Sequence, residues 1–172
     1  MVIWIIGLAG SGKTTLGTEL AVRLRAHDRP VVLLDGDAVR SALGDDLGHT
    51  VADRRRNGRR IAGLSRLLET QGIDVVACVL AIDPAQLAWN RATFHAYVEV
   101  DLDVPWATLE ARDQKGLYSG ARAGRVRDVV GIDIPFARPS APDLVLGEAD
   151  GLAGIGSQVD RIVDLALARA AA

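Results

Sequence analysis

Short apolar runs alternate with longer segments of mixed polarity along this chain of 172 residues. The apolar runs are rich in β-branched residues and predict strands at Val2–Ile6, Val31–Leu34, Ile73–Leu80, Ala96–Val100 and Leu144–Leu146. The remaining stretches predict helices at Lys13–Ala26, Ala38–Leu43, Asp53–Gln71, Pro84–Ala92, Pro105–Arg112 and Gly156–Ala170. Near-continuous apolar runs are typical of strands buried on both faces, as in a parallel sheet. The pattern predicts one α/β domain over residues 1–172, a three-layer α/β/α sandwich with a mostly parallel five-stranded sheet.

One segment, Asp113–Pro142, breaks this alternation. It contains glycines, arginines and prolines and shows little apolar periodicity. A long irregular stretch inside a compact domain is usually functional. We therefore expect residues 113–142 to form a mobile lid over a binding site.

The composition limits the classes of protein to which the chain can belong. Hydrophobic residues make up 49% of it and charged residues 24%, which excludes a disordered chain. A net charge of −2 argues against a partner that is a nucleic acid polymer, and no apolar run is long enough to cross a membrane. The single cysteine, Cys78, excludes an internal disulfide and favours a reducing, cytoplasmic location. The sequence leaves the oligomeric state open, and a homodimer is compatible with it.

The segment Gly7–Thr14 matches the phosphate-binding pattern G-x-x-x-x-G-K-[ST] between a predicted strand and a predicted helix. The alternative, a glycine-rich turn that only fits the pattern, is disfavoured by this context and by the scarcity of lysine, since Lys13 and Lys115 are the only lysines among 20 basic residues. The pattern predicts a P-loop kinase or hydrolase fold that binds ATP with Mg²⁺. Lys13 would reach the β- and γ-phosphates, and Thr14 would ligate the metal, with Asp35 as a second candidate ligand. The predicted ATP-binding residues of the loop are Gly7, Ala9, Gly10, Ser11, Gly12, Lys13, Thr14 and Thr15.

The predicted strand Val31–Leu34 is followed by Asp35-Gly36-Asp37, with Arg40 three residues further on. Ligands bind at the carboxyl ends of strands in such sheets, and a helix that begins near Asp37 would put Asp37 and Arg40 on one face. A carboxylate beside a guanidinium suits a kinase, because the carboxylate can take the proton of an acceptor hydroxyl while the arginine holds an anion. The alternative is that Asp37 only caps the helix.

The most basic stretch of the chain is Asp53–Arg60. Helical spacing places Arg54 and Asn57 on one face, with Arg60 close to them. These side chains could bind a phosphate-bearing acceptor. A charge run is also the usual composition of a solvated helix face, and the sequence leaves both interpretations open.

Taken together, these motifs resemble the adenylylsulfate (APS) kinases. The resemblance includes the P-loop, Leu34-Asp35-Gly36-Asp37 with Arg40, the Asp53–Arg60 motif, Arg112-Asp113-x-Lys115-Gly116-Leu117-Tyr118 and Gly131-Ile132-Asp133. It implies transfer of the ATP γ-phosphate to the ribose 3′-hydroxyl of a 5′-modified nucleotide, with Lys13 and the base Asp37 as catalytic residues and Arg112 on the ATP side. The acceptor-binding residues that it implies are Asp37, Arg40, His49, Arg54, Asn57, Lys115, Gly116, Leu117, Val129 and Ile132.

The chain departs from the family pattern on the acceptor side. His49 and Val129 stand where the family usually has two aromatic residues that sandwich the adenine. Leu80–Pro84 replaces a Ser-Pro-aromatic-Arg segment, so the serine that some members are thought to phosphorylate is absent and transfer should be direct. The expected acceptor is APS. The alternatives are another nucleotide-linked acceptor such as cytidine diphosphoramidate, a sugar or antibiotic hydroxyl, or a nucleotide sensor without transfer.

Overall fold

The computed structural model describes residues 1–80, 83–147 and 154–171. Its strands are β1 (Val2–Ile6), β2 (Val31–Asp35), β3 (Asp74–Val79), β4 (Tyr97–Asp103) and β5 (Leu144–Gly147). Its helices are α1 (Lys13–Arg25), α2 (Gly36–Ala42), α3 (Val51–Glu69), α4 (Pro84–Thr93), α5 (Trp106–Arg112), a short 3-10 turn (Gln114–Gly116), α6 (Leu117–Arg122) and α7 (Ile155–Ala170). Every strand and helix predicted from the sequence is present, with ends shifted by a few residues.

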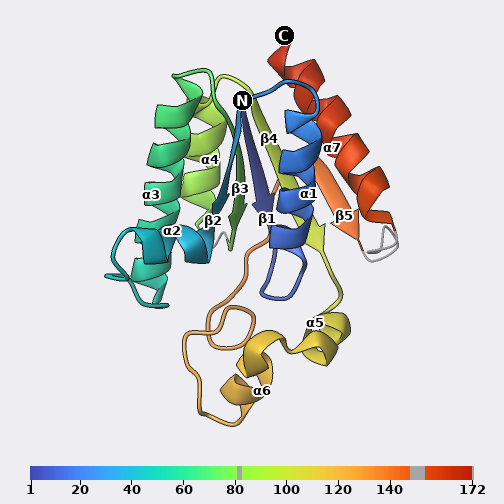
Figure 1. Ribbon diagram of the computed structural model, residues 1–172. Coiled ribbons are helices and arrows are strands. Elements are labelled where there is room, and N and C mark those ends of the chain that lie inside the picture. The colour runs from blue at the N-terminus through green and yellow to red at the C-terminus, as the bar shows by residue number, and fades with distance from the viewer. Residues whose placement is uncertain (81–82, 148–153, 172) are drawn as a thin grey trace.

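The strands form one sheet in the order β2-β3-β1-β4-β5, and every pairing in it is parallel. The central strand β1 pairs with β3 and β4, with Ile3 opposite Val76 and Val98. All five residues of β1 are buried, as its unbroken apolar sequence predicts. The carboxyl ends of the strands point toward the same end of the molecule, which is the end that carries the P-loop and residues 113–142 (Figure 1).

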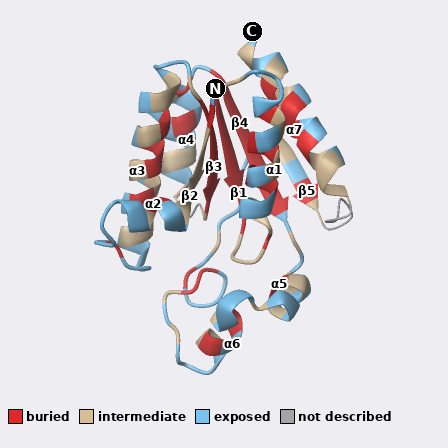
Figure 2. Ribbon diagram, in the orientation of Figure 1, coloured by how far each residue is buried: buried red, intermediate tan, exposed pale blue. Residues whose placement is uncertain are grey.

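Two hydrophobic clusters hold the helices against the sheet. Ile3 and Ile5 of β1 pack with α1 and α7 on one face, and Val2, Trp4 and Ile6 pack with α2 and α3 on the other. The buried residues of the sheet therefore lie between two helical layers (Figure 2). The predicted three-layer α/β/α sandwich is confirmed. Within the described residues, no helix is long and apolar enough to cross a membrane.

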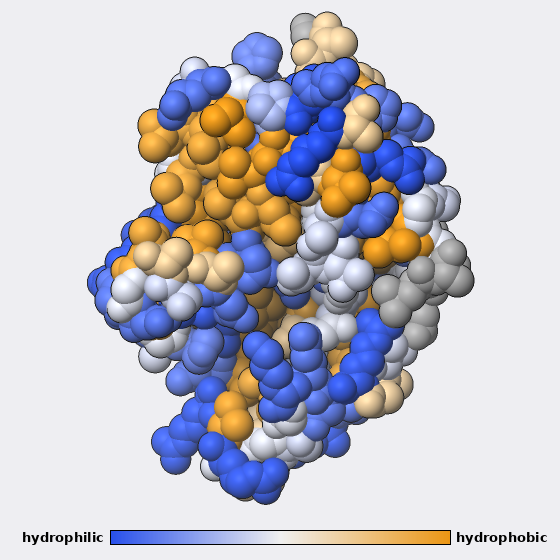
Figure 3. Space-filling model, viewed as in Figure 1, coloured by the Kyte–Doolittle hydropathy of each residue, from blue (hydrophilic) through white to orange (hydrophobic). Residues whose placement is uncertain are grey.

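The predicted lid, residues 113–142, differs from its expected irregular structure. It contains the whole 3-10 turn and helix α6, and it has a small core in which Tyr118 and Val129 pack with Leu109 of α5. Leu8 and Ala9 of the P-loop pack against the same cluster. The lid surface is mostly hydrophilic, whereas hydrophobic residues gather at the opposite end of the view in Figure 3. The lid is thus a small packed unit that rests on the phosphate loop.

Candidate active site

The loop between β1 and α1 has the backbone that a phosphate-binding loop requires. Gly10 and Gly12 have φ values of 77° and 94°, in the left-handed region that favours glycine. A Cβ on Gly7 would lie 2.5 Å from the Ser11 hydroxyl oxygen, so the loop also needs glycine there for space. Gly12 is the N-cap of α1 and provides no side-chain cap, which leaves backbone N–H groups of the first turn available to an anion.

Lys13, the first residue of α1, folds back over this loop. Its ammonium donates a hydrogen bond to the Leu8 carbonyl at 2.7 Å. Burial lowers the pKa of Lys13 to about 8, although the nearby Cys78, Asp35 and Asp37 act in the opposite direction. The amine is therefore still mostly protonated at neutral pH, and it interacts electrostatically with Asp35 and Asp37.

Thr14 and Thr15 follow in the first turn of α1 and are exposed. The Thr14 hydroxyl donates to Oδ2 of Asp35 at 2.7 Å, and Oδ1 of Asp35 accepts from the backbone N–H groups of Asp37 and Ala38. Asp35 is the N-cap of α2, which begins at Gly36. The alternative role of Asp37 as the helix cap is therefore wrong, because the carboxylate two residues earlier already fills that position.

Asp37 and Arg40 lie on one face of α2, as their spacing predicts. The Arg40 guanidinium donates to the Asp37 carboxylate at 2.8 Å; the Asp37 side chain is 74% exposed and the Arg40 side chain only 11%. Both residues line a hollow of about 60 Å³ together with Arg54, Asn57 and Leu80. The residues predicted for the acceptor from α2 and α3 thus meet at one cavity.

Two residues of α3 that line this hollow form hydrogen bonds to other segments: Asn57 to the start of α2 and Arg54 to the lid. Asn57 is buried and donates from its amide to the Gly36 carbonyl at 2.9 Å, while its Oδ1 has no partner among the described residues. Arg54 donates to the Asp128 carbonyl of the lid at 2.8 Å. Burial and the adjacent Arg40 lower the pKa of Arg54. The hollow therefore carries two guanidinium groups close together, an arrangement that favours an anionic ligand.

Arg60 and His49 have different positions relative to this hollow. Arg60 forms a two-point ion pair with Asp46 at 2.6 Å and does not line the hollow. His49 is exposed, and its pKa is lowered first by partial burial and then by Arg40 and Arg54. A neutral imidazole therefore lies within electrostatic reach of the two guanidinium groups.

The lid residues predicted to contact the acceptor are spread over its surface and core. Lys115 and Gly116 have φ values of 61° and 64° and are exposed, Leu117 is half-buried, and Ile132 is 36% exposed. Among the described residues that line the hollow beside Asp37, none belongs to this group. Val129 is 1% exposed inside the lid cluster. In this conformation it has no free surface for a base, and its place in a base pocket stays a prediction.

Two hydrogen bonds join the lid region to the phosphate loop. The Tyr118 hydroxyl donates to the Ala9 carbonyl at 2.8 Å, and the Arg112 guanidinium donates to the Gly10 carbonyl at 2.9 Å. In the sequence Tyr118 stands out only as part of a motif. A hydrogen bond from its hydroxyl to Ala9, which is far away along the chain, has no local sequence signal. The position of the lid is therefore coupled to the shape of the phosphate loop.

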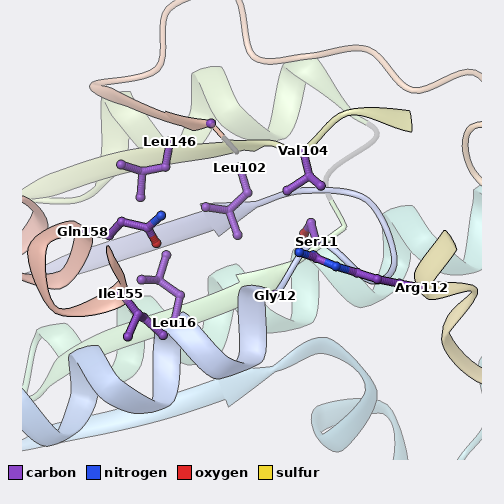
Figure 4. A pocket seen from close by; sticks show the side chains of 10 residues that line it. Ser11, Gly12, Leu16, Leu102, Val104, Arg112, Leu146, Ile155 and Gln158 are labelled. Atoms are coloured by element: carbon purple, nitrogen blue, oxygen red, sulfur yellow. The ribbon is translucent and has the colours of Figure 1, made fainter. Parts of the chain in front are cut away.

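A second hollow, of about 50 Å³, lies on the other side of the phosphate loop (Figure 4). Ser11 and Arg112 border it at one end, and Leu102, Val104, Ile155 and Gln158 from β4, its following loop and α7 form much of the rest (Figure 4). The Ser11 hydroxyl oxygen is buried without a hydrogen-bond partner in the described part of the chain. The α7 residues have no local sequence signal, since they enter the site only through tertiary packing.

The family model described as adenylylsulphate kinase matches residues 1–147. The chain is 40% identical over 163 residues to the adenylyl-sulfate kinase of Paraburkholderia xenovorans, covering 94% of this chain and 90% of that protein. It is 43% identical over 152 residues to the bifunctional enzyme CysN/CysC of Xylella fastidiosa, covering 87% of this chain and only 24% of the relative.

A solved structure supports the same family. The Mycobacterium tuberculosis APS kinase CysC, in complex with AMPPNP and APS, superposes with a TM-score of 0.87 at 34% identity, covering 95% of each chain. The family match extends from the phosphate loop through the lid to β5 and so includes every site residue described above except those of α7. On this evidence, the chain belongs to the adenylylsulphate kinase family.

Proposed function

We propose that the protein is an ATP-dependent kinase that transfers the γ-phosphate of ATP directly to the ribose 3′-hydroxyl of adenylylsulfate. The observation that carries this proposal is the position of Asp37. Its exposed carboxylate lines the hollow that contains Arg40 and Arg54, and its charge also acts on the Lys13 ammonium of the phosphate loop. A proton acceptor thus lies between the donor and acceptor sites. The names and bound ligands of the relatives support APS as the acceptor.

On the donor side, we assign the phosphates of ATP to the loop from Gly7 to Thr15. The left-handed glycines and the uncapped N-terminus of α1 present backbone N–H groups, and Lys13 would exchange its bond to the Leu8 carbonyl for a phosphate oxygen. The hollow in Figure 4 then suits the nucleoside end of ATP, because its walls are mainly apolar and Arg112 lies at the edge nearest the loop.

Thr14 and Asp35 provide a hydroxyl oxygen and a carboxylate oxygen 2.7 Å apart beside the phosphate loop. Such oxygens suit Mg²⁺, which is usually held by one or two protein ligands together with substrate phosphates. The described residues contain no group of three His, Cys, Asp or Glu side chains able to hold a metal alone. Magnesium, when bound, would neutralise charge on the β- and γ-phosphates. Thr14, or Thr14 with Asp35, would hold it.

On the acceptor side, Asp37 would accept the proton of the 3′-hydroxyl. The ribose oxygen then forms a bond to the γ-phosphorus as the bond to the β-phosphate oxygen breaks, and ADP leaves with that electron pair. Arg40 keeps the carboxylate in place, and Arg54 and Asn57 hold the acceptor. Lys115, Gly116, Leu117 and Ile132 would cover it from the lid. Direct transfer is part of the proposal, although residues 81 and 82 of the altered segment Leu80–Pro84 lie outside the described residues.

A different nucleotide-linked acceptor is the second candidate, and one observation favours it. Val129 is buried in the lid cluster, so the described residues that were expected to sandwich adenine provide only the imidazole of His49. A smaller base, as in cytidine diphosphoramidate, needs less stacking surface.

An acceptor panel distinguishes these candidates. With ATP and Mg²⁺, we expect APS to give ADP and a 3′-phosphorylated product, with kcat/KM about 100-fold above that of cytidine diphosphoramidate, adenosine or a hexose. The measurement is coupled ADP release, with the product identified by mass spectrometry. Transfer to the cytidine compound alone would support the second candidate. If none of the acceptors in the panel gave ADP, a nucleotide kinase would be contradicted.

The lid should close over both nucleotides, because it already bonds to the phosphate loop through Tyr118 and to the acceptor pocket through Arg54. Its exposed residues Arg125 and Arg127 are sites for trypsin. We expect APS with ADP to slow cleavage there about tenfold or more, as measured by mass spectrometry of the fragments. Cleavage after the exposed Arg25 of α1 serves as the internal control. Equal rates with and without the nucleotides would contradict a closing lid.

A cytoplasmic location and a homodimer also belong to the proposal. Cys78 is buried and unpaired, which is compatible with a reducing compartment. Light scattering coupled to size-exclusion chromatography tests the dimer.

A further inference from the structure

Trp4 lies in the middle of β1 and is 1% exposed. Its indole Nε1 has no hydrogen-bond partner in the part of the chain that the structure describes. An indole N–H can only donate, and a buried donor without an acceptor costs free energy. A group that is not part of the described chain is therefore expected to accept this hydrogen bond.

The space beside Trp4 is a hollow of about 30 Å³, which exceeds the room that one oxygen-sized group needs. It shares Arg54, Gly58, Val79 and Leu80 with the hollow that Asp37 and Arg40 line. Trp4 therefore borders an inner hollow that adjoins the acceptor pocket and shares Arg54 with it.

The unused polar groups around these two hollows are mostly donors. Nε of Arg54 and Nε of Arg40 are buried without partners within the described residues, as is Nε1 of Trp4. The carboxylate in the inner hollow, Asp83, is already engaged: it caps α4 by accepting from the Ala85 N–H, and it lies 3.6 Å from Nε of Arg55. The inner hollow thus favours a group that only accepts hydrogen bonds, such as a fully ionised oxyanion.

We propose that Trp4 is a specificity-determining residue, whose indole N–H donates to an oxygen of the acidic group at the end of the acceptor furthest from the reacting hydroxyl. The inference rests on the proposed function, in which that group is the 5′-linked sulfate. Sulfate oxygens carry no protons at neutral pH and match a donor-only side chain. A terminal amine would bring N–H groups against the indole N–H, so Trp4 selects against phosphoramidate-type acceptors.

The indole N–H signals in a two-dimensional ¹H–¹⁵N NMR spectrum test this directly, because the chain has only three tryptophans, Trp4, Trp89 and Trp106. Trp4→Phe assigns the Trp4 signal by removing it. In the wild-type protein with Mg·ADP, we expect APS to shift this signal, whereas AMP, which has the same base and ribose but no sulfate, leaves it in place. The exposed Trp89 should respond to neither.

The outcomes separate the two proposals. If APS shifts lid signals but leaves the Trp4 indole unchanged, an ordered water or nothing accepts from it; the inference is then overturned and the proposed function stands. If APS and AMP shift the Trp4 indole signal equally, the inference is likewise overturned. If APS changes no signal, both fail.

Kinetics provide a second readout. Trp4→Phe keeps an aromatic ring but removes the donor, so we expect the KM for APS to rise about tenfold while kcat and the KM for ATP change less than about twofold. The preference for APS over adenosine 5′-phosphoramidate should fall by a similar factor. The control Trp89→Phe, at a position of α4 that is 44% exposed, should leave all constants unchanged. A loss of Tm with an unchanged KM for APS, or an equal rise in both KM values, would assign Trp4 to packing alone.

Discussion

Replacing Asp37 by asparagine is expected to lower kcat by about 10²–10⁴, the range found when a general base is lost. Asparagine has nearly the same shape, and its carbonyl can still accept from Arg40, but it cannot take the proton of the 3′-hydroxyl. The KM for ATP should change little, since Asp37 lies on the acceptor side of the phosphate loop. Steady-state kinetics with saturating ATP and APS measure both quantities.

The structure makes this substitution a clean test, because Asp37 is not a helix cap. Asp35 caps α2, and the Asp37 side chain is 74% exposed, so its pair with Arg40 contributes little to stability. We expect the free energy of unfolding to change by less than about 0.5 kcal/mol. Asp164→Asn, an exposed position on α7, is the matched control and should keep wild-type kcat. If Asp37→Asn retained kcat within about threefold, Asp37 could not be the base.

The fold and the donor side of the site could be predicted from local patterns. The phosphate loop depends on glycine conformations and on a strand and a helix that flank it directly, and all of these lie within one short stretch of sequence. The pairing of Asp37 with Arg40 also follows from helical spacing alone, once α2 is known to begin near Asp37.

Features that depend on contacts between distant segments cannot be predicted from local patterns. Val129 packs beside Tyr118 and Leu109, and a phenylalanine there would require this small cluster to repack. Arg60 is held by Asp46 of the preceding loop and does not line the hollow beside Asp37. Helical spacing fixes the face on which a side chain lies, and it cannot show which neighbour occupies that face.

Trp4 illustrates the same limit in another way. An aromatic residue inside an apolar strand is expected to be part of the core, and Trp4 does pack there. Its indole nitrogen matters only because Arg54 of α3 and Asp83 before α4 enclose a hollow beside it. No pattern within β1 can report that arrangement.

Replacing Lys13 by alanine is expected to reduce transfer to background, a loss of at least about 10³-fold in kcat/KM, and to weaken ATP binding. The ammonium of Lys13 lies over the phosphate loop, bonded to the Leu8 carbonyl, and the other lysine of the chain, Lys115, is on the lid. No second amine is therefore available to neutralise the γ-phosphate. Coupled kinetics measure the rate, and titration calorimetry measures the affinity for ATP.

Lys13→Met is the matched variant, since it keeps an unbranched apolar stem and removes only the charge. Burial lowers the pKa of Lys13 from 10.5 to about 8 in the folded protein, so its charged form destabilises the fold below pH 8. That cost disappears between about pH 8 and 10.5, where the folded chain has lost the proton and the unfolded chain keeps it. Lys13→Met should therefore be inactive yet have a higher Tm than the wild type at pH 7, with a smaller difference at pH 9.5. An inactive variant with a lower Tm at pH 7 would point to a structural role, and near-normal turnover would contradict the assignment of the phosphate loop.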